Sequence, residues 1–380
     1  MLLYLHANRN RSIAVTLITL VLMVSCSKEP EVEMVPVMMV PVLPATYYNY
    51  EDIQFPESFD FPPLNFNNSS ANNNPVTNSG ATLGRVLFYD KNLSINHTTS
   101  CGSCHHQEKA FADPEVFSTG HGGGKTHRNA SHLVNFRFNN RVFWDLRATN
   151  LEVQVLMPIQ DEIEMGMTLD ELELRLSTID YYAPLFSDAF GDAEITSERI
   201  ALALGQFVRS IVSYHTKFDE GWPTFDNFSE EELLGRGVYM STIGNCSFCH
   251  FPVSFHNPQA LNNGLDLVYE DGGLGDINGN AADIGKFKVP SLRNVELTAP
   301  YMHDGRFQTL EEVIEHYNSG VQQHPNLDDR LTVETTTGGT PKHLNLSQEQ
   351  KEGLLAFLKT LTDYSLISDP KFSDPFQAVN

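Results

Sequence analysis

Cys101-Gly-Ser-Cys104-His105 and Cys246-Ser-Phe-Cys249-His250 repeat one five-residue pattern, Cys-x-x-Cys-His, in a chain of 380 residues that holds five cysteines. Two thiols at this spacing can attach to the two vinyl groups of one haem, and the imidazole that follows can bind its iron. A zinc site would need further Cys or His ligands at suitable spacing, and a redox dithiol would not need the histidine. The two stretches therefore predict two covalently bound c-type haems, with His105 and His250 as iron ligands.

The fifth cysteine, Cys26, follows an N-terminus typical of export. Arg9 and Arg11 precede an apolar run over 13–24, and the small Ser25 stands directly before the cysteine. This order describes a secretory signal, and with Cys next it resembles a bacterial lipoprotein signal, in which that cysteine is lipidated. An ordinary signal peptide or a short membrane anchor is the alternative, although the run is short for a span of about 20 residues. We expect a protein on the periplasmic side of the bacterial cell envelope that reaches the membrane by a lipid anchor only.

The remaining chain divides into a polar segment and a body long enough for two domains. After the signal peptide, 1–25, residues 26–76 are rich in Pro, Asn and Glu, which predicts a flexible tether. Helical patterns dominate the body and strand alternation is weak. The predicted fold class is mainly α, with two cytochrome c-like haem domains in tandem, 77–225 and 226–366, followed by a C-terminal tail, 367–380.

Several helix starts carry a Ser or Thr three residues before a Glu or Gln, so that the two side chains cap each other's backbone amides. This pattern occurs at Ser229 with Glu232, at Thr309 with Glu312 and at Ser347 with Gln350. A further amphipathic helix is predicted over 196–215, because its apolar residues recur at helical spacing.

The net charge of −23 argues against nucleic acid as a partner and against binding to an anionic membrane surface. It favours a basic or dipole-oriented redox partner through electrostatic steering. The oligomeric state is open, a homodimer included.

Two haems alone could simply pass electrons, whereas peroxide chemistry also needs an acid/base side chain beside the iron. The segment between the haem motifs offers Trp144, Gln154, Pro158 and Glu164 in a short stretch. These residues are the candidates for a reactive pocket.

Further motifs accompany the haem motifs over about 83–361. They are Leu83-Gly84-x-x-Leu87-Phe88-Tyr89-Asp90, Arg128-Asn129-Ala130, Phe143-Trp144-Asp145-x-Arg147, the stretch from Gln154 to Glu164-Met165, Phe287-Lys288-Val289-Pro290-Ser291-Leu292-Arg293-Asn294, and Thr298-Ala299-Pro300-Tyr301-Met302-His303-Asp304-Gly305. With them, the chain resembles the bacterial di-haem cytochrome c peroxidases and the related methylamine-utilisation di-haem enzymes.

The resemblance implies a role for each matching position. His105 would be the proximal ligand of the peroxide-reactive haem, and His250 that of the electron-transfer haem. Glu164 would be the acid/base group, Gln154 would help polarise bound peroxide, and Trp144 would relay electrons between the haems.

The resemblance also implies one Ca²⁺ ion between the domains. Asn129, Thr298 and Pro300 match the residues that hold it, largely through carbonyl oxygens. Hard oxygen ligands of this kind suit Ca²⁺.

The sixth ligand of the second iron has two candidates. Ligand chemistry favours Met302, because a thioether downstream of the haem motif is the usual low-spin partner. The resemblance instead places the ligand at Tyr317, where ordinary peroxidases carry Met and the methylamine-utilisation enzymes carry Tyr. We expect Tyr317; the alternatives are Met302 and an open site.

At the first haem, His121 matches a histidine that caps the iron in the resting peroxidases and leaves on activation. It is a possible resting-state ligand of iron 1; the alternatives are an exposed loop histidine, or His127 in this role. Gly244 departs from the family, since the methylamine-utilisation enzymes carry a surface Trp there. That departure argues against a protein-modifying role.

We therefore expect a cytochrome-c peroxidase that reduces hydrogen peroxide to water. Its electrons would come from a small cytochrome c or another periplasmic reductant, enter at the C-terminal haem and cross near Trp144. One alternative is oxidation of a protein or organic substrate through high-valent haems, as in the methylamine-utilisation enzymes. The other is a non-enzymatic electron carrier.

Overall fold

A computed structural model gives the fold of the chain and describes residues 38–60, 74–139 and 141–379. The predicted signal peptide and Cys26 lie outside the described residues. Within the described ranges, no helix has the length and apolar character needed to cross a membrane.

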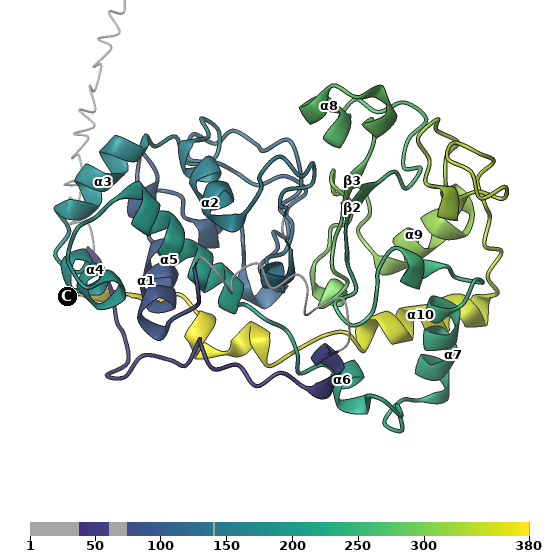
Figure 1. Cartoon of the computed structure of the whole chain (residues 1–380), viewed down its shortest axis with the longest axis horizontal. Helices are drawn as coiled ribbons and strands as arrows, with labels where there is room; N and C mark the ends of the chain where they lie inside the picture. Colours follow the sequence, from purple (N-terminus) through teal and green to yellow (C-terminus); the bar gives the residue numbers. More distant parts are fainter. Residues whose placement is uncertain (1–37, 61–73, 140, 380) are drawn as a thin grey trace, which may run out of the picture. The chain divides into compact units, whose positions relative to one another are not determined.

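Helices α1 (Asn78–Tyr89) and α5 (Ser197–Ser210) form the centre of a first apolar core (Figure 1). The two helices approach closely at Gly84, where a Cβ atom would lie 2.0 Å from the carbonyl oxygen of Ala203. Helix α2 (Leu151–Gln160) packs against α5. Helices α3 (Leu169–Ser177) and α4 (Tyr182–Phe190) complete this group.

A second apolar core surrounds the crossing of α7 (Glu230–Met240) and α10 (Gln348–Lys359) (Figure 1). This crossing also depends on glycine, because a Cβ atom at Gly235 would lie 1.7 Å from the carbonyl oxygen of Gly353. Three shorter helices belong to the same half: α6 (Lys217–Gly221), α8 (Leu274–Asn278) and α9 (Leu310–Glu315). Helix α9 continues into a π-helical turn, His316–Gly320.

Strands are few and short, which agrees with the predicted mainly α class. Strand β1 (Met38–Pro41) pairs with β4 (Phe376–Val379). Strand β2 (Asn257–Leu261) pairs antiparallel with β3 (Phe287–Val289), with Ala260 opposite Lys288. Single turns of 3₁₀ helix link these elements at Glu57–Asp60, Lys91–Leu93, Cys101–Ser103, Gln107–Lys109, Phe136–Phe138, Cys246–Phe248, Ala281–Asp283, Val295–Leu297, Asp329–Leu331, Leu366–Ser368 and Pro370–Phe372.

The three predicted capping boxes are confirmed, at the starts of α7, α9 and α10. The helix predicted over 196–215 is shorter than expected and ends at Ser210. Beyond that point the backbone bonds to Asn135 instead of continuing the helix: the N–H of Ser213 donates to Asn135 Oδ1 (2.9 Å), and the carbonyl of Ile211 accepts from the N–H of Asn135 (2.9 Å).

The segment predicted as a tether packs on the body over residues 39–59. Tyr50 is 1% exposed in the first core and its hydroxyl donates to the carbonyl of Lys371 (2.5 Å). Phe59 is buried in the second core. The flexible-tether prediction is therefore wrong for these residues. Their aromatic side chains are buried although the sequence shows no helical or strand periodicity there. Residues 26–37 and 61–73 of the predicted tether lie outside the described residues. The predicted tail also packs, since Phe372 is buried in the first core.

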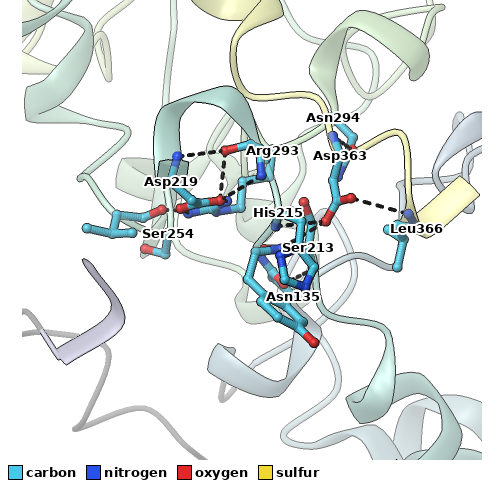
Figure 2. A network of polar contacts seen from close by, with 12 residues as sticks. Asn135, Ser213, His215, Asp219, Ser254, Arg293, Asn294, Asp363 and Leu366 are labelled. Carbon is cyan, nitrogen blue, oxygen red and sulfur yellow. Dashed lines mark hydrogen bonds and ion pairs between the residues drawn. The ribbon is translucent and has the colours of Figure 1, made fainter. Parts of the chain in front are cut away.

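A polar network marks the passage between the two cores (Figure 2). The carboxylate of Asp363 accepts from the backbone N–H groups of Tyr214 and His215, both at 3.1 Å. Beside it, the guanidinium of Arg293 donates to both carboxylate oxygens of Asp219 at 2.7 Å, with both side chains buried. After α5 the chain passes from the first core, at Ile211, to the second, at Val212, which is before the predicted boundary at 225/226.

Candidate haem sites

A first cavity of about 60 Å³ surrounds the first haem motif. Cys101, Cys104 and His105 line it together with Gln154 and Glu164. Most of the other lining side chains are apolar: Phe88, Leu133, Val155, Pro158, Met165, Leu204 and Val208. The fold thus brings together predicted residues that come from two separate parts of the chain.

The imidazole of His105 is oriented for metal binding. Its Nδ1 donates to the carbonyl of Phe111 (2.8 Å), which fixes the tautomer and leaves Nε2 with a free lone pair. Burial lowers the pKa of His105, so the ring is neutral, as a metal ligand must be. These features fit a c-type haem attached to Cys101 and Cys104, both free thiols.

Local structure explains how Gln154 and Glu164 reach this cavity. Gln154 and Pro158 stand one turn apart on α2 and therefore share the face that lines it. At the end of α2, the carboxylate of Asp161 accepts from the N–H groups of Ile163 (2.8 Å) and Glu164 (3.0 Å). This turn carries Glu164 back to the cavity.

The carboxyl group of Glu164 has the properties of an acid/base group. Burial raises its pKa to about 7 and the charge of Asp161 adds to the rise, while Arg147 opposes it. No hydrogen bond or ion pair joins this carboxyl group to another described residue. It can therefore hold or release a proton near neutral pH.

His121, the possible resting-state ligand, does not line the first cavity. Its Nε2 donates to the carbonyl of Glu162 (3.0 Å), and its backbone N–H donates to the carbonyl of Glu164 (3.0 Å). His127, the alternative, is exposed. The structure thus does not bring either histidine to the first haem site, and a ligand role for His121 stays a prediction.

A second cavity of about 220 Å³ surrounds the second haem motif, Cys246 to His250. The Nδ1 atom of His250 donates to the carbonyl of Pro290 (3.1 Å) and lies 3.3 Å from that of Phe255. Burial lowers the pKa of His250 to about 4, which keeps the ring neutral with Nε2 available. Cys246 and Cys249 are free thiols, so this site also fits a c-type haem.

Both candidates for the sixth ligand line the second cavity. Tyr317 lies in the π-helical turn after α9, a local distortion that often marks functional sites. The side-chain amide of Asn263 donates to the Tyr317 hydroxyl (3.4 Å) and to the Met302 sulfur (3.6 Å). The choice between Tyr317 and Met302 stays a prediction. Sequence reasoning missed Asn263, which no motif or period marks.

Trp144 also lines the second cavity and links the two halves of the chain. Its indole N–H donates to the carbonyl of Asn129 (2.9 Å), and its own carbonyl accepts from the N–H of Lys288 (2.6 Å). Nearby, the Arg128 guanidinium contacts Asp145 and donates to both carboxylate oxygens of Asp271 (2.6 and 2.7 Å). These contacts fix Trp144 where residues of the two halves meet.

The three residues predicted to hold calcium, Asn129, Thr298 and Pro300, line the same cavity. The side-chain N–H₂ of Asn129 donates to the carbonyl of Glu115 (3.0 Å), so the amide oxygen of Asn129 points away from Glu115. The set offers oxygen atoms of the kind Ca²⁺ prefers. A calcium ion here stays a prediction.

Two histidine-anchored cavities, each with a cysteine pair, in a mainly helical chain define a di-haem c-type protein. The profile of the family described as di-haem cytochrome c peroxidase matches residues 78–223. The methylamine utilization protein MauG of Methylorubrum extorquens is 32% identical over 292 residues, which cover 76% of this chain and 79% of that protein. The cytochrome c551 peroxidase of Nitrosomonas europaea is 33% identical over 288 residues, 74% and 79% of the two chains.

A solved structure, of a MauG-like protein associated with microbial copper homeostasis, is similar with a TM-score of 0.71 and 37% identity, covering 80% of this chain and 94% of its own. The chain belongs to the di-haem cytochrome c peroxidase and MauG family. Membership in a di-haem family, with two cysteine pairs, supports two c-type haems.

Proposed function

We propose that the protein is an exported di-haem peroxidase that reduces hydrogen peroxide to water with electrons from a small cytochrome c or another periplasmic reductant. The observation that carries this proposal is the pairing of Glu164 and Gln154 in the cavity of the first haem motif. Neither side chain hydrogen-bonds to another described residue, so both are available to a small polar substrate. Related proteins named cytochrome c peroxidase support the proposal.

When bound, the haems would supply electrons and the iron at which the O–O bond of peroxide breaks. The chain's own residues would manage protons and orientation. The Glu164 carboxylate would take the proton from one peroxide oxygen and deliver it to the other, a role that its pKa of about 7 suits. The side-chain N–H₂ of Gln154 would donate to a peroxide oxygen and orient it.

Electron supply would be the task of the second site. Tyr317, or Met302 in its place, would hold the second haem together with His250, and Trp144 would lie on the route to the first site. Ca²⁺ bound by Asn129, Thr298 and Pro300 would link the two halves of the chain. His121 would cap the first site only after its loop has moved.

The N-terminal sequence suggests where the protein works. A lipid on Cys26 would hold it to the membrane on the periplasmic side of the bacterial cell envelope, where small cytochromes can reach it. The net charge of −23 would steer basic faces of such donors towards it.

A second candidate function is oxidation of a protein or organic substrate, which Tyr317 in the second cavity favours through its likeness to the methylamine-utilisation enzymes. The backbone around Gly244 argues against it. Gly244 is buried, and a Cβ atom there would lie 2.4 Å from the carbonyl of Val238, which leaves no room for the Trp that those enzymes carry.

The test is steady-state peroxide reduction by the two-haem protein with a reduced small cytochrome as donor. Replacing Glu164 by Gln should lower the turnover by about 10²–10⁴-fold, the usual contribution of a general acid/base. Glu162→Gln is the matched control, since Glu162 is exposed two residues away, and it should retain wild-type turnover.

Equal turnover of wild type and Glu164→Gln would refute the acid/base assignment. A wild-type protein with both haems attached that does not reduce peroxide would refute the peroxidase proposal and leave the electron carrier.

A further inference from the structure

Lys288 on β3 is a buried lysine without a partner. The residue is 4% exposed, and no hydrogen bond or ion pair joins its Nζ to another described residue. Its Nζ lies over the ring of Phe136, 4.8 Å from the centroid. Burial lowers the pKa of Lys288 to about 8, and no acidic side chain contributes to this shift. An ammonium group in such surroundings is costly unless an anion accompanies it.

Two histidines beside Lys288 also have unused polar atoms. His132 is 8% exposed; its Nε2 donates to the carbonyl of Ser291 (3.0 Å), while its buried Nδ1 has no hydrogen-bond partner in the part of the chain that the structure describes. His256 is 4% exposed, and its buried Nε2 has none either. Burial, together with the nearby positive charge of Lys288, lowers the pKa of both rings to about 4. Both rings are therefore neutral, and the ammonium group of Lys288 supplies the positive charge of this cluster, which attracts an anion.

The position of this basic cluster identifies the anion. Lys288 and His132 both line the second cavity, whose wall also carries Cys246, Cys249 and His250. Most of that wall is apolar, so a buried ligand there must combine an apolar body with a negative group. A c-type haem has this composition, because its apolar ring carries two propionate carboxylates.

We propose that Lys288, flanked by His132 and His256, binds a propionate carboxylate of the haem attached to Cys246 and Cys249. The ammonium group supplies a charge-assisted hydrogen bond to the carboxylate. The backbone N–H of Lys288 also donates to the carbonyl of Trp144 (2.6 Å), so the same residue ties the haem edge to the tryptophan. This assignment needs the second haem but not peroxide turnover, so the two proposals can fail separately.

The experiment measures the reduction potential of each haem in the two-haem protein by spectropotentiometric titration. The thioether bonds keep the haem in place, so Lys288→Met removes the charge without loss of the cofactor. The equilibrium ratio of ferric to ferrous second haem should then rise about tenfold. This corresponds to a fall of about 59 mV in its one-electron reduction potential. The first haem should keep its potential, Lys288→Arg should restore the second, and the exposed Lys359→Met should change neither.

Resonance Raman spectroscopy of the haem propionate bending band gives a second readout. In the wild type this band should shift in D₂O, because exchangeable Nζ protons hold the carboxylate, and the shift should be lost in Lys288→Met. An unshifted band in D₂O overturns the proposal even if the Met variant does not fold. So does a wild-type potential that follows the concentration of added phosphate, because the cluster then binds a free anion instead.

Discussion

The two haem sites share an attachment motif and differ in almost everything around it. In both, a cysteine pair precedes a histidine whose Nδ1 donates to a backbone carbonyl. The first cavity adds Glu164 and Gln154, whose side chains have no hydrogen-bond partner among the described residues, whereas the second adds Tyr317 and Met302 around the amide of Asn263. The motif therefore predicts where a haem is attached, whereas residues distant in sequence form the different surroundings of the two cavities.

The cores that carry the two sites differ as well. The second contains Arg293 and Asp219, an ion pair buried on both sides. The corresponding pair of the first, Arg209 and Glu152, leaves the carboxylate 24% exposed. Each of these differences between the two halves can be tested by a substitution.

The largest effect is expected at the sixth ligand of the second haem. Because the axial ligand is the strongest determinant of haem potential, Tyr317→Met should raise the potential of the second haem by on the order of a few tenths of a volt. Met302→Leu, on the same cavity wall, should leave it unchanged. Spectropotentiometry with EPR of the ferric protein checks both variants, and the opposite pattern would identify Met302 as the ligand.

Next in size is the buried ion pair of the second core (Figure 2). Asp219→Asn leaves the charge of Arg293 buried without a counter-ion, so the free energy of unfolding should fall by about 3–5 kcal/mol. Glu152→Gln should cost less, about 1–3 kcal/mol, because water reaches that carboxylate. Denaturant unfolding of the two-haem protein measures both; a larger loss for Glu152→Gln would contradict the contrast between the cores.

The pH dependence of Glu164 distinguishes the first site. The pKa of this residue rises from 4.5 to about 7 on folding, so the folded protein keeps a proton that the unfolded chain releases between these values. Its contribution to stability therefore falls as the pH rises from about 4.5 to 7, by at most about 3 kcal/mol. Glu164→Gln should accordingly be more stable than the wild type at pH 8 and equally stable at pH 4.

The ionisation of Glu164 should also change the rate of peroxide turnover near pH 7. This pH dependence should be absent in Glu164→Gln. Thermal unfolding and peroxide turnover across pH measure the two effects. A pH dependence that persists in the Gln variant would assign the ionisation to another group.

The smallest effect is expected at His121. Because its ring is bonded to the carbonyl of Glu162 outside the first cavity, His121→Ala should change the turnover of the reduced enzyme by less than about twofold. Stopped-flow assays from the fully oxidised and the half-reduced protein check this. A large change that is confined to the oxidised enzyme would mean that the loop carries His121 to the first haem site at rest.

Local patterns were the most predictable part of the fold. The capping boxes at Ser229, Thr309 and Ser347 are confirmed because each depends on side chains only three residues apart. The end of α5 was not predictable, because Asn135, distant in sequence, bonds the backbone beyond Ser210. Residues 39–59 were misjudged for a similar reason, since Tyr50 and Phe59 bury in different cores without any sequence period.

The sequence by itself predicts two haem attachments, at Cys101, Cys104 and His105 and at Cys246, Cys249 and His250, because that chemistry needs only five consecutive residues. Tertiary structure alone decided the surroundings. Folding brings Glu164 into the cavity of His105, turns His121 away from it, and buries Lys288 near His132 and His256, each of which keeps one ring nitrogen without a partner among the described residues. Burial and the loss of water create these properties, and both depend on contacts between segments that no local pattern connects.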